Sequence, residues 1–163
     1  MTKTRIAVIM ASLIPSLLLA PVADAFTLSA NQMQDFKFFR AHSFSFPGIF
    51  RNHHPGPKWI LNHQQLFHLS PQQKVQELHL TQEMVATTIK DVTALKVLYH
   101  KYEVASAKTN PNPTVLKTDI TLIGKQQARA AYEMIPYHLA GYEALTPTQQ
   151  IIYERMGTKG VGG

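Results

Sequence analysis

The chain has 163 residues, with 16 Lys or Arg, 10 Asp or Glu and a formal charge of +6 at neutral pH. This length favours a single domain. The charges are dispersed and contain no Lys/Arg block typical of nucleic-acid binding, so we expect no nucleic-acid partner. Cysteine is absent, which excludes disulfides and thiolate chemistry.

The first 25 residues have the three parts of an export signal. Lys3 and Arg5 precede an apolar run over residues 6–20, and Ala23 and Ala25 supply the small residues that a signal peptidase needs. The apolar run is shorter than the roughly 20 residues that span a bilayer. We therefore predict a signal peptide over residues 1–25, cleaved after Ala25, and a periplasmic location.

Residues 26–57 form an aromatic and basic stretch broken by Pro and Gly. Six of the chain's eight Phe lie between residues 36 and 50. Pro47-Gly48 and Pro55-Gly56-Pro57 are expected to interrupt helices and strands. We predict a flexible arm without a core of its own. It is either a simple tether, or residues 36–50 fold over the helical domain as a removable plug.

Helical signals dominate the predicted domain over residues 58–156. A short helix is expected over residues 59–67. Ser70, Pro71 and Gln73 then have the order of an N-cap, a first-turn proline and a reciprocal cap. The helix that they begin is expected to reach about residue 107, because apolar residues recur at spacings of three, four and seven. They are Val75, Leu78, Val85, Ile89, Val92, Leu95, Tyr99 and Tyr102. The carboxylates Glu77, Glu83 and Asp91 are interpreted as surface charges paired with lysines.

A second long helix is predicted over residues 115–144, after the helix-ending sequence Asn-Pro-Asn-Pro at residues 110–113. Pro136 is expected to kink this helix near residues 132–133. Its predicted inner face is Leu116, Ile120, Ile123, Ala130, Met134, His138, Tyr142 and Leu145. Thr146 and Pro147 begin a last helix that ends near Met156, and a Gly-rich tail over residues 157–163 is predicted to be disordered.

These elements predict an all-α fold of four helices, in which two long antiparallel helices form a hairpin with short flanking helices. A lone hairpin buries little apolar surface for its length. We therefore expect a homodimer.

Two helix-start signals share one form. The first is Leu69-Ser70 followed by Gln73, and the second is Leu145-Thr146 followed by Gln149. This arrangement resembles the Leu-Thr-x-x-Gln (LTxxQ) family of small periplasmic proteins, which includes Spy-like and CpxP-like chaperones and stress-response proteins and periplasmic heavy-metal resistance and sensor proteins. The resemblance covers residues 59–156. It implies a curved, cradle-like dimer and a role in protecting envelope proteins or in responding to metals.

An ATP-independent chaperone needs a surface that is partly apolar and partly basic, so that unfolded clients or partner proteins are attracted and held weakly. The candidates on the long helices are Met84, Ile89, Leu95, Leu98, Tyr102, Lys90, Lys96, Lys101, Lys125 and Arg129. The alternative is that the apolar members are core and the basic members a solvated face.

The second functional class is a metal-responsive protein that modulates a membrane sensor. Its candidate ligands for Zn, Ni or Cu are His63, His68 and His138. His63 and His68 are five residues apart and do not share a helical face, and the chain lacks the His-x-x-x-His pair of metal-sensing relatives. No sequence motif of an enzyme or of ATP binding is present, so we expect neither catalysis nor a cofactor.

Overall fold

The computed structural model describes residues 26–42 and 46–157, and all regular structure in these ranges is helical. The helices are α1 (Ala30–His42), α2 (Phe46–His53), α3 (Pro57–Asn62), α4 (Pro71–Ser106), α5 (Pro113–Glu133), α6 (Ile135–Glu143) and α7 (Pro147–Gly157). The predicted all-α class is confirmed, but the described residues hold more helices than the four expected. The predicted signal peptide lies outside the described residues, as does the tail beyond Gly157.

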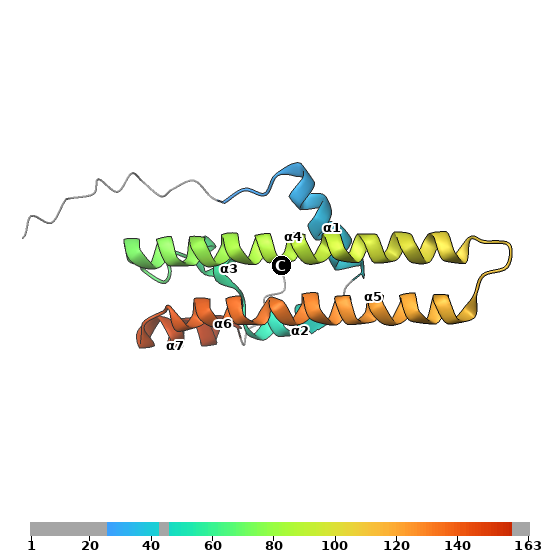
Figure 1. The fold of residues 1–163 in the computed structure, drawn as a ribbon. Coiled ribbons are helices and arrows are strands. Elements are labelled where there is room, and N and C mark those ends of the chain that lie inside the picture. The colour runs from blue at the N-terminus through green and yellow to red at the C-terminus, as the bar shows by residue number, and fades with distance from the viewer. Residues whose placement is uncertain (1–25, 43–45, 158–163) are drawn as a thin grey trace, which may run out of the picture.

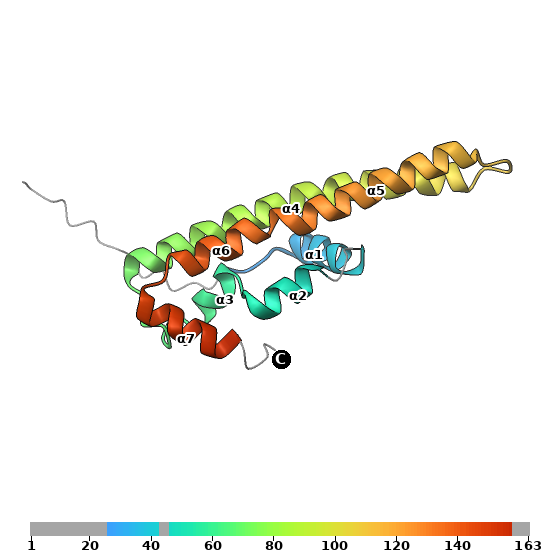
Figure 2. The ribbon, with the colours of Figure 1, turned by 90° about the horizontal axis from the view of Figure 1, so that it is seen from below.

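α4 and α5 lie side by side and run in opposite directions, and α6 continues along the line of α5 (Figure 1). The helices α4, α5 and α6 form one layer, and Figure 2 shows α1, α2, α3 and α7 on one side of it. The ends of α4 and α5 nearest their connection project beyond the other helices. The covered part of the layer therefore lies toward the start of α4 and the end of α6.

Both long helices begin with side-chain caps. Gln73 N donates to Ser70 Oγ at 3.2 Å and Ser70 N donates to Gln73 Oε1 at 3.0 Å, so the predicted capping box of α4 is formed. α4 has 36 residues and ends at Ser106, as predicted to within a residue. Asn112 caps α5 by accepting from Thr114 N and Val115 N, which starts this helix at Pro113 rather than at residue 115.

The second long helix is interrupted near Pro136, as expected. α5 ends at Glu133 and α6 begins at Ile135, with Met134 between them. Proline has no N–H to donate to the carbonyl four residues earlier, which here belongs to Tyr132. The interruption falls one residue beyond the predicted position.

The prediction of an arm without regular structure was wrong for the described part of residues 26–57. Pro47 lies in the first turn of α2, where the missing N–H is not needed, so the Pro47-Gly48 pair does not prevent a helix. α1 is preceded by a reciprocal cap, in which Ser29 N donates to Gln32 Oε1 at 2.8 Å and Gln32 N to Ser29 Oγ at 3.3 Å. Leu28 precedes this cap, so residues 28–32 also have the Leu-Ser-x-x-Gln pattern.

The helix expected over residues 59–67 is shorter than predicted. α3 ends at Asn62, and turns follow up to His68. His63 Nδ1 lies 2.8 Å from Trp59 O, and His68 has a left-handed φ of 49°. These features direct the chain from α3 into the cap of α4.

The buried side chains form two clusters. One contains Ile60, Phe67, Leu69, Leu145 and Tyr153 and lies where α3, α6 and α7 meet the start of α4. The other contains Phe39, Val92 and Ala130 and joins α1 to the long helices. The arm thus contributes Phe39 to the core of the molecule.

Polar residues are part of the buried face of α4, which the apolar stripe did not predict. Glu77, Thr81, Thr88 and Asp91 are all buried. Thr81 and Thr88 donate at 2.8 Å to the carbonyls four residues earlier, which satisfies their hydroxyls within the helix. The interpretation of Glu77 and Asp91 as surface charges was therefore wrong, and so was the inner-face assignment of Val75 and Ile120, which are exposed.

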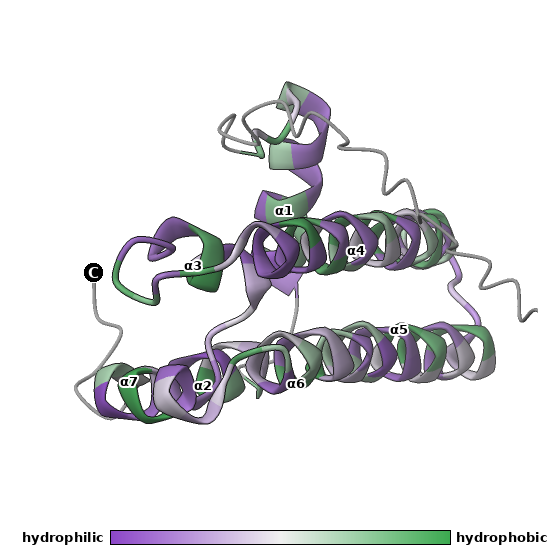
Figure 3. Ribbon diagram, turned by 90° about the vertical axis from the view of Figure 1, so that its left-hand side faces the viewer, coloured by the Kyte–Doolittle hydropathy of each residue, from purple (hydrophilic) through white to green (hydrophobic). Residues whose placement is uncertain are grey.

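Figure 3 views the molecule along the long helices, with α3 and α7 beside the near ends of α4 and α6. Hydrophilic and hydrophobic residues alternate around both long helices in this view. Among the described residues, no helix combines the length and the apolar character needed to cross a membrane.

Candidate binding site and the paired capping motifs

The two capping motifs meet through their glutamines. Thr146 N donates to Gln149 Oε1 at 2.8 Å, which forms a second box at the start of α7. Gln73 Nε2 donates to Gln149 Oε1 at 2.7 Å and to Ala144 O at 3.0 Å. In return, Gln149 Nε2 donates to Phe67 O at 2.8 Å and lies 3.2 Å from Gln73 Oε1. Each glutamine therefore completes its own cap and also fixes the segment that leads into the other motif.

The leucines of the motifs are buried beside this junction. Leu69 and Leu145 belong to the same cluster as Ile60 and Tyr153, so both point into the core between helices. Tyr153 OH donates to Pro55 O at 2.7 Å. This bond links α7 to the segment between α2 and α3, so the motif junction also holds the end of the arm.

A fully buried carboxyl lies next to the junction. Glu77 has no exposed surface, and neither of its carboxyl oxygens has a hydrogen-bond partner among the described residues. A Cβ at Gly141 would lie 3.0 Å from Glu77 Oε2, so α6 approaches the carboxyl closely because residue 141 is Gly. Burial raises the pKa of Glu77 to about 8. The folded protein therefore holds Glu77 mainly in its neutral form at pH 7.

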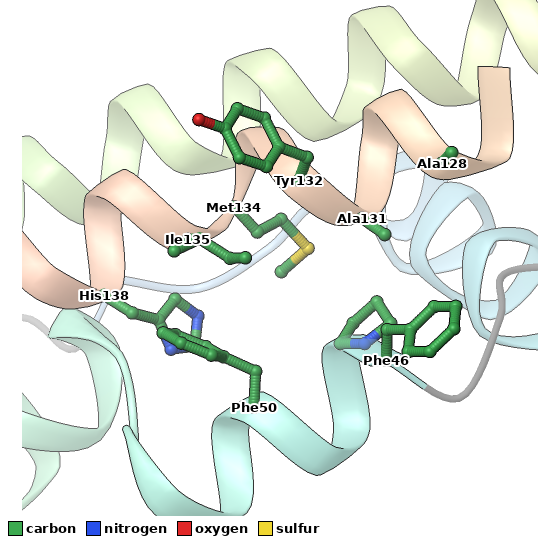
Figure 4. A pocket seen from close by; sticks show the side chains of 9 residues that line it. Phe46, Phe50, Ala128, Ala131, Tyr132, Met134, Ile135 and His138 are labelled. Atoms are coloured by element: carbon green, nitrogen blue, oxygen red, sulfur yellow. The ribbon is translucent and has the colours of Figure 1, made fainter. Parts of the chain in front are cut away.

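An apolar cavity of about 220 Å³ lies between α2 and the α5–α6 layer. Figure 4 shows Phe46 and Phe50 of α2 on one side and Tyr132, Ile135 and His138 on the other. Pro47, Ala128, Ala131 and Met134 complete the lining. Phe46 and Tyr132 at its edge are 67% and 69% exposed. The cavity therefore combines an apolar interior with apolar side chains that solvent reaches.

His138 forms one end of this cavity. Its Nδ1 lies 2.6 Å from His54 O, and because a carbonyl only accepts, Nδ1 carries the proton. Burial lowers the pKa of His138, so the ring is neutral near pH 7. Its ring also contacts Phe50, with 5.9 Å between centroids. His138 thus joins α6 to α2 and to the backbone that follows α2.

We expect Gly56→Ala to destabilise the protein by roughly 1–3 kcal/mol, since overpacking costs about this much. A Cβ at Gly56 would lie 2.9 Å from His138 Nε2 and 3.0 Å from two further ring atoms, so the ring must move. Gly48→Ala is the matched control, because nothing lies within 4 Å of a Cβ there. Urea denaturation measures the difference, and equal stability of the two variants would contradict the packing described.

The predicted apolar contact residues differ in accessibility. Met84 and Leu95 are buried, so they cannot contact a client in this conformation, and that part of the prediction was wrong. Ile89, Leu98 and Tyr102 are half-buried. Only these three of the five present part of their surface to solvent.

Three of the predicted basic contact residues have acidic partners within the chain. Lys96 Nζ lies 2.6 Å from Asp35 Oδ1 on α1, and Lys101 Nζ lies 3.1 Å from the buried Asp119. Arg129 Nε lies 2.6 Å from Glu133 Oε1 and 3.6 Å from Asp91 Oδ1. Lys90 and Lys125 are exposed, and in the described parts of the chain neither has an ion pair.

The three histidines of the metal hypothesis are not brought together. His63 follows α3, His68 is exposed and His138 is buried in α6. Within residues 26–42 and 46–157, no group of three His, Asp or Glu side chains is placed to hold a metal ion. His138 has an apolar environment instead.

Sequence reasoning missed the cavity and Glu77 for different reasons. The spacing of Phe46 and Phe50 is a helical signal, but the intervening Pro47-Gly48 pair predicts a break. Glu77 precedes Met84 by seven residues and Leu95 by eighteen, which are close to whole numbers of helical turns, so its spacing places it on the face of these buried residues. Its charge led to the opposite interpretation.

Comparison with protein-family models, curated proteins and solved structures gives no significant match. The resemblance to the LTxxQ family therefore stays a prediction from the two motifs.

Proposed function

We propose that this protein is an ATP-independent chaperone-like protein of the periplasm, which binds unfolded or partner proteins through an apolar and basic helical surface. The observation that supports it best is the junction of Gln73 and Gln149. Each residue caps its own helix and also binds the segment before the other motif. This mutual bonding gives a physical reason for the motif to occur at both helix starts, as the resemblance requires.

The accessible side chains agree with such a role. Tyr132, which lines the apolar cavity, is more than half exposed, and Ala128 on the same wall is also exposed. Lys90 and Lys125 lie at a similar level of the long helices, because their neighbours Asp91 and Gln126 are joined by a 3.0 Å hydrogen bond. Weak apolar contacts hold a client, and nearby cations speed its encounter with acidic segments. Neither step requires a nucleotide.

We propose further that two copies of this chain associate into a homodimer. α4 exposes Val97 and Val104, and α5 exposes Val115 and Ile120. Exposed apolar side chains on two neighbouring helices favour association, because burying them removes apolar surface from water. The dimer forms the cradle that the resemblance implies. Sedimentation analysis of the purified protein tests this, and a monomer at micromolar concentration would contradict it.

The test of function is suppression of aggregation. We expect the purified protein, mixed in equal amount with a client diluted from denaturant, to lower light scattering without ATP. High salt should reduce the effect, because screening weakens encounter between exposed charges. The double variant Lys90→Glu, Lys125→Glu should act severalfold more slowly on an acidic client.

Lys108→Glu, in the turn after α4, is the matched control for charge reversal and should leave the activity unchanged.

The purified natural protein is also titrated with Zn, Ni and Cu. Submicromolar metal binding together with no protection of the client would overturn the proposal in favour of a metal-responsive protein.

A further inference from the structure

α2 is attached more loosely than the helices on either side of it. None of its residues is buried, whereas α1 buries Phe39 and α3 buries Pro57 and Ile60. A helix of eight residues is not stable alone in water. Its helical form therefore depends on the contacts that it makes with α5 and α6.

Those contacts come from one side of the helix. Phe46 and Phe50 are four residues apart, so they lie on one helical face, and both line the cavity. Ile49 does not line the cavity and is 57% exposed. α2 therefore meets the long layer as a short segment with two aromatic anchors.

The opposite wall is shaped to receive such anchors. Ala128 and Ala131 on α5 have small side chains that leave space, and Met134 and Ile135 line the cavity where α5 gives way to α6 (Figure 4). Methionine adapts its shape to varied partners. A groove of this kind binds helical segments through residues spaced by one turn.

Removal of α2 from this wall leaves its neighbours in place. α1 is held by Phe39 in the core and by the ion pair of Asp35 with Lys96. α3 is held by Ile60 in the other cluster. Neither Phe46 nor Phe50 belongs to a buried cluster, so α2 can leave the wall while both cores stay intact.

We propose that the wall of α5 and α6 beneath α2 binds segments of unfolded proteins that present two aromatic side chains four residues apart, and that α2 is its built-in occupant. This inference rests on the proposed function and names the client pattern. A client binds by replacing α2. Its apparent dissociation constant is therefore the intrinsic constant divided by the fraction of molecules in which α2 has left the wall.

The test uses a fluorescently labelled peptide with the sequence of residues 46–53, Phe-Pro-Gly-Ile-Phe-Arg-Asn-His, and a control peptide with Ala at both Phe positions. We expect the double variant Phe46→Ala, Phe50→Ala to bind the first peptide about tenfold more tightly than the natural protein does, because its own occupant is weakened. The control peptide should bind neither protein. Ile49→Ala is the matched protein control and should bind like the natural chain.

Ala128→Trp, added to the double variant, fills the groove and should abolish peptide binding. If the double variant suppresses aggregation but binds both peptides equally, the inference fails and the proposed function stands. If it binds the aromatic peptide but protects no client, the proposed function fails. Circular dichroism checks that the double variant is folded. If it is not, the single variant Phe46→Ala is used for the same peptide-binding and aggregation measurements.

Discussion

The Glu77→Gln variant is expected to be more stable than the natural protein at pH 7 by about 3 kcal/mol. Glu77 has no exposed surface, and burial raises its pKa from the ordinary 4.5 to about 8. The unfolded chain ionises this carboxyl near pH 4.5, but the folded chain keeps it neutral. Each pH unit between the two values costs roughly 1.4 kcal/mol of folding free energy, and the amide avoids that cost.

The sign of the pH dependence follows from the same shift. Between pH 4.5 and about 8 the folded state binds a proton at Glu77 that the unfolded state has released, so stability falls as pH rises through this window. His138 acts oppositely below its ordinary pKa of 6.5, because burial lowers its pKa and acid therefore favours the unfolded state. The difference between the two proteins isolates the effect of Glu77, since His138 is present in both.

Urea denaturation of both proteins at about pH 5, 7 and 9 measures this difference. It should increase with pH and level off above about 8. Glu83→Gln is the matched control, because Glu83 is an exposed glutamate on the same helix. A difference that does not change with pH would show that the folded protein ionises Glu77 as readily as the unfolded chain does.

The sequence predicted the parts of the fold that local chemistry determines. Ser70 with Gln73 and Thr146 with Gln149 begin helices where expected, because a capping box involves residues only three apart. Pro136 interrupts the second long helix because the missing N–H is a property of proline itself. These features need no knowledge of distant contacts.

The parts that failed depend on tertiary packing. The helix α2 depends on the wall that α5 and α6 provide for Phe46 and Phe50, and this wall lies far along the chain. Glu77 is buried because Gly141 on another helix approaches it closely. Lys96 and Lys101 were expected to be available, but their acidic partners lie on other helices. The candidate site therefore emerged from contacts between segments far apart in the sequence.

Gln73→Ala and Gln149→Ala are each expected to destabilise the protein by about 2 kcal/mol, and the double variant by less than their sum. Each glutamine loses its own cap and leaves a distant carbonyl, Ala144 O or Phe67 O, without its donor. The side chains also bond each other at 2.7 Å, so the second removal finds part of the network already broken. A double-mutant cycle in urea gives the coupling, which we expect to be about 1 kcal/mol.

The same variants separate two roles of the motif. If each glutamine only capped its own helix, Gln73→Ala would loosen the first turn of α4 and leave α7 unchanged. Because Gln73 also binds Gln149, we expect this variant to speed hydrogen exchange of the Gln149 and Gln150 amides, which donate hydrogen bonds to Thr146 at the start of α7. Gln72→Ala, on the exposed side of the same α4 turn, should leave α7 exchange unchanged. Additive stabilities with unchanged exchange in α7 would mean that the two motifs act as independent caps, and the physical reason for their pairing would be lost.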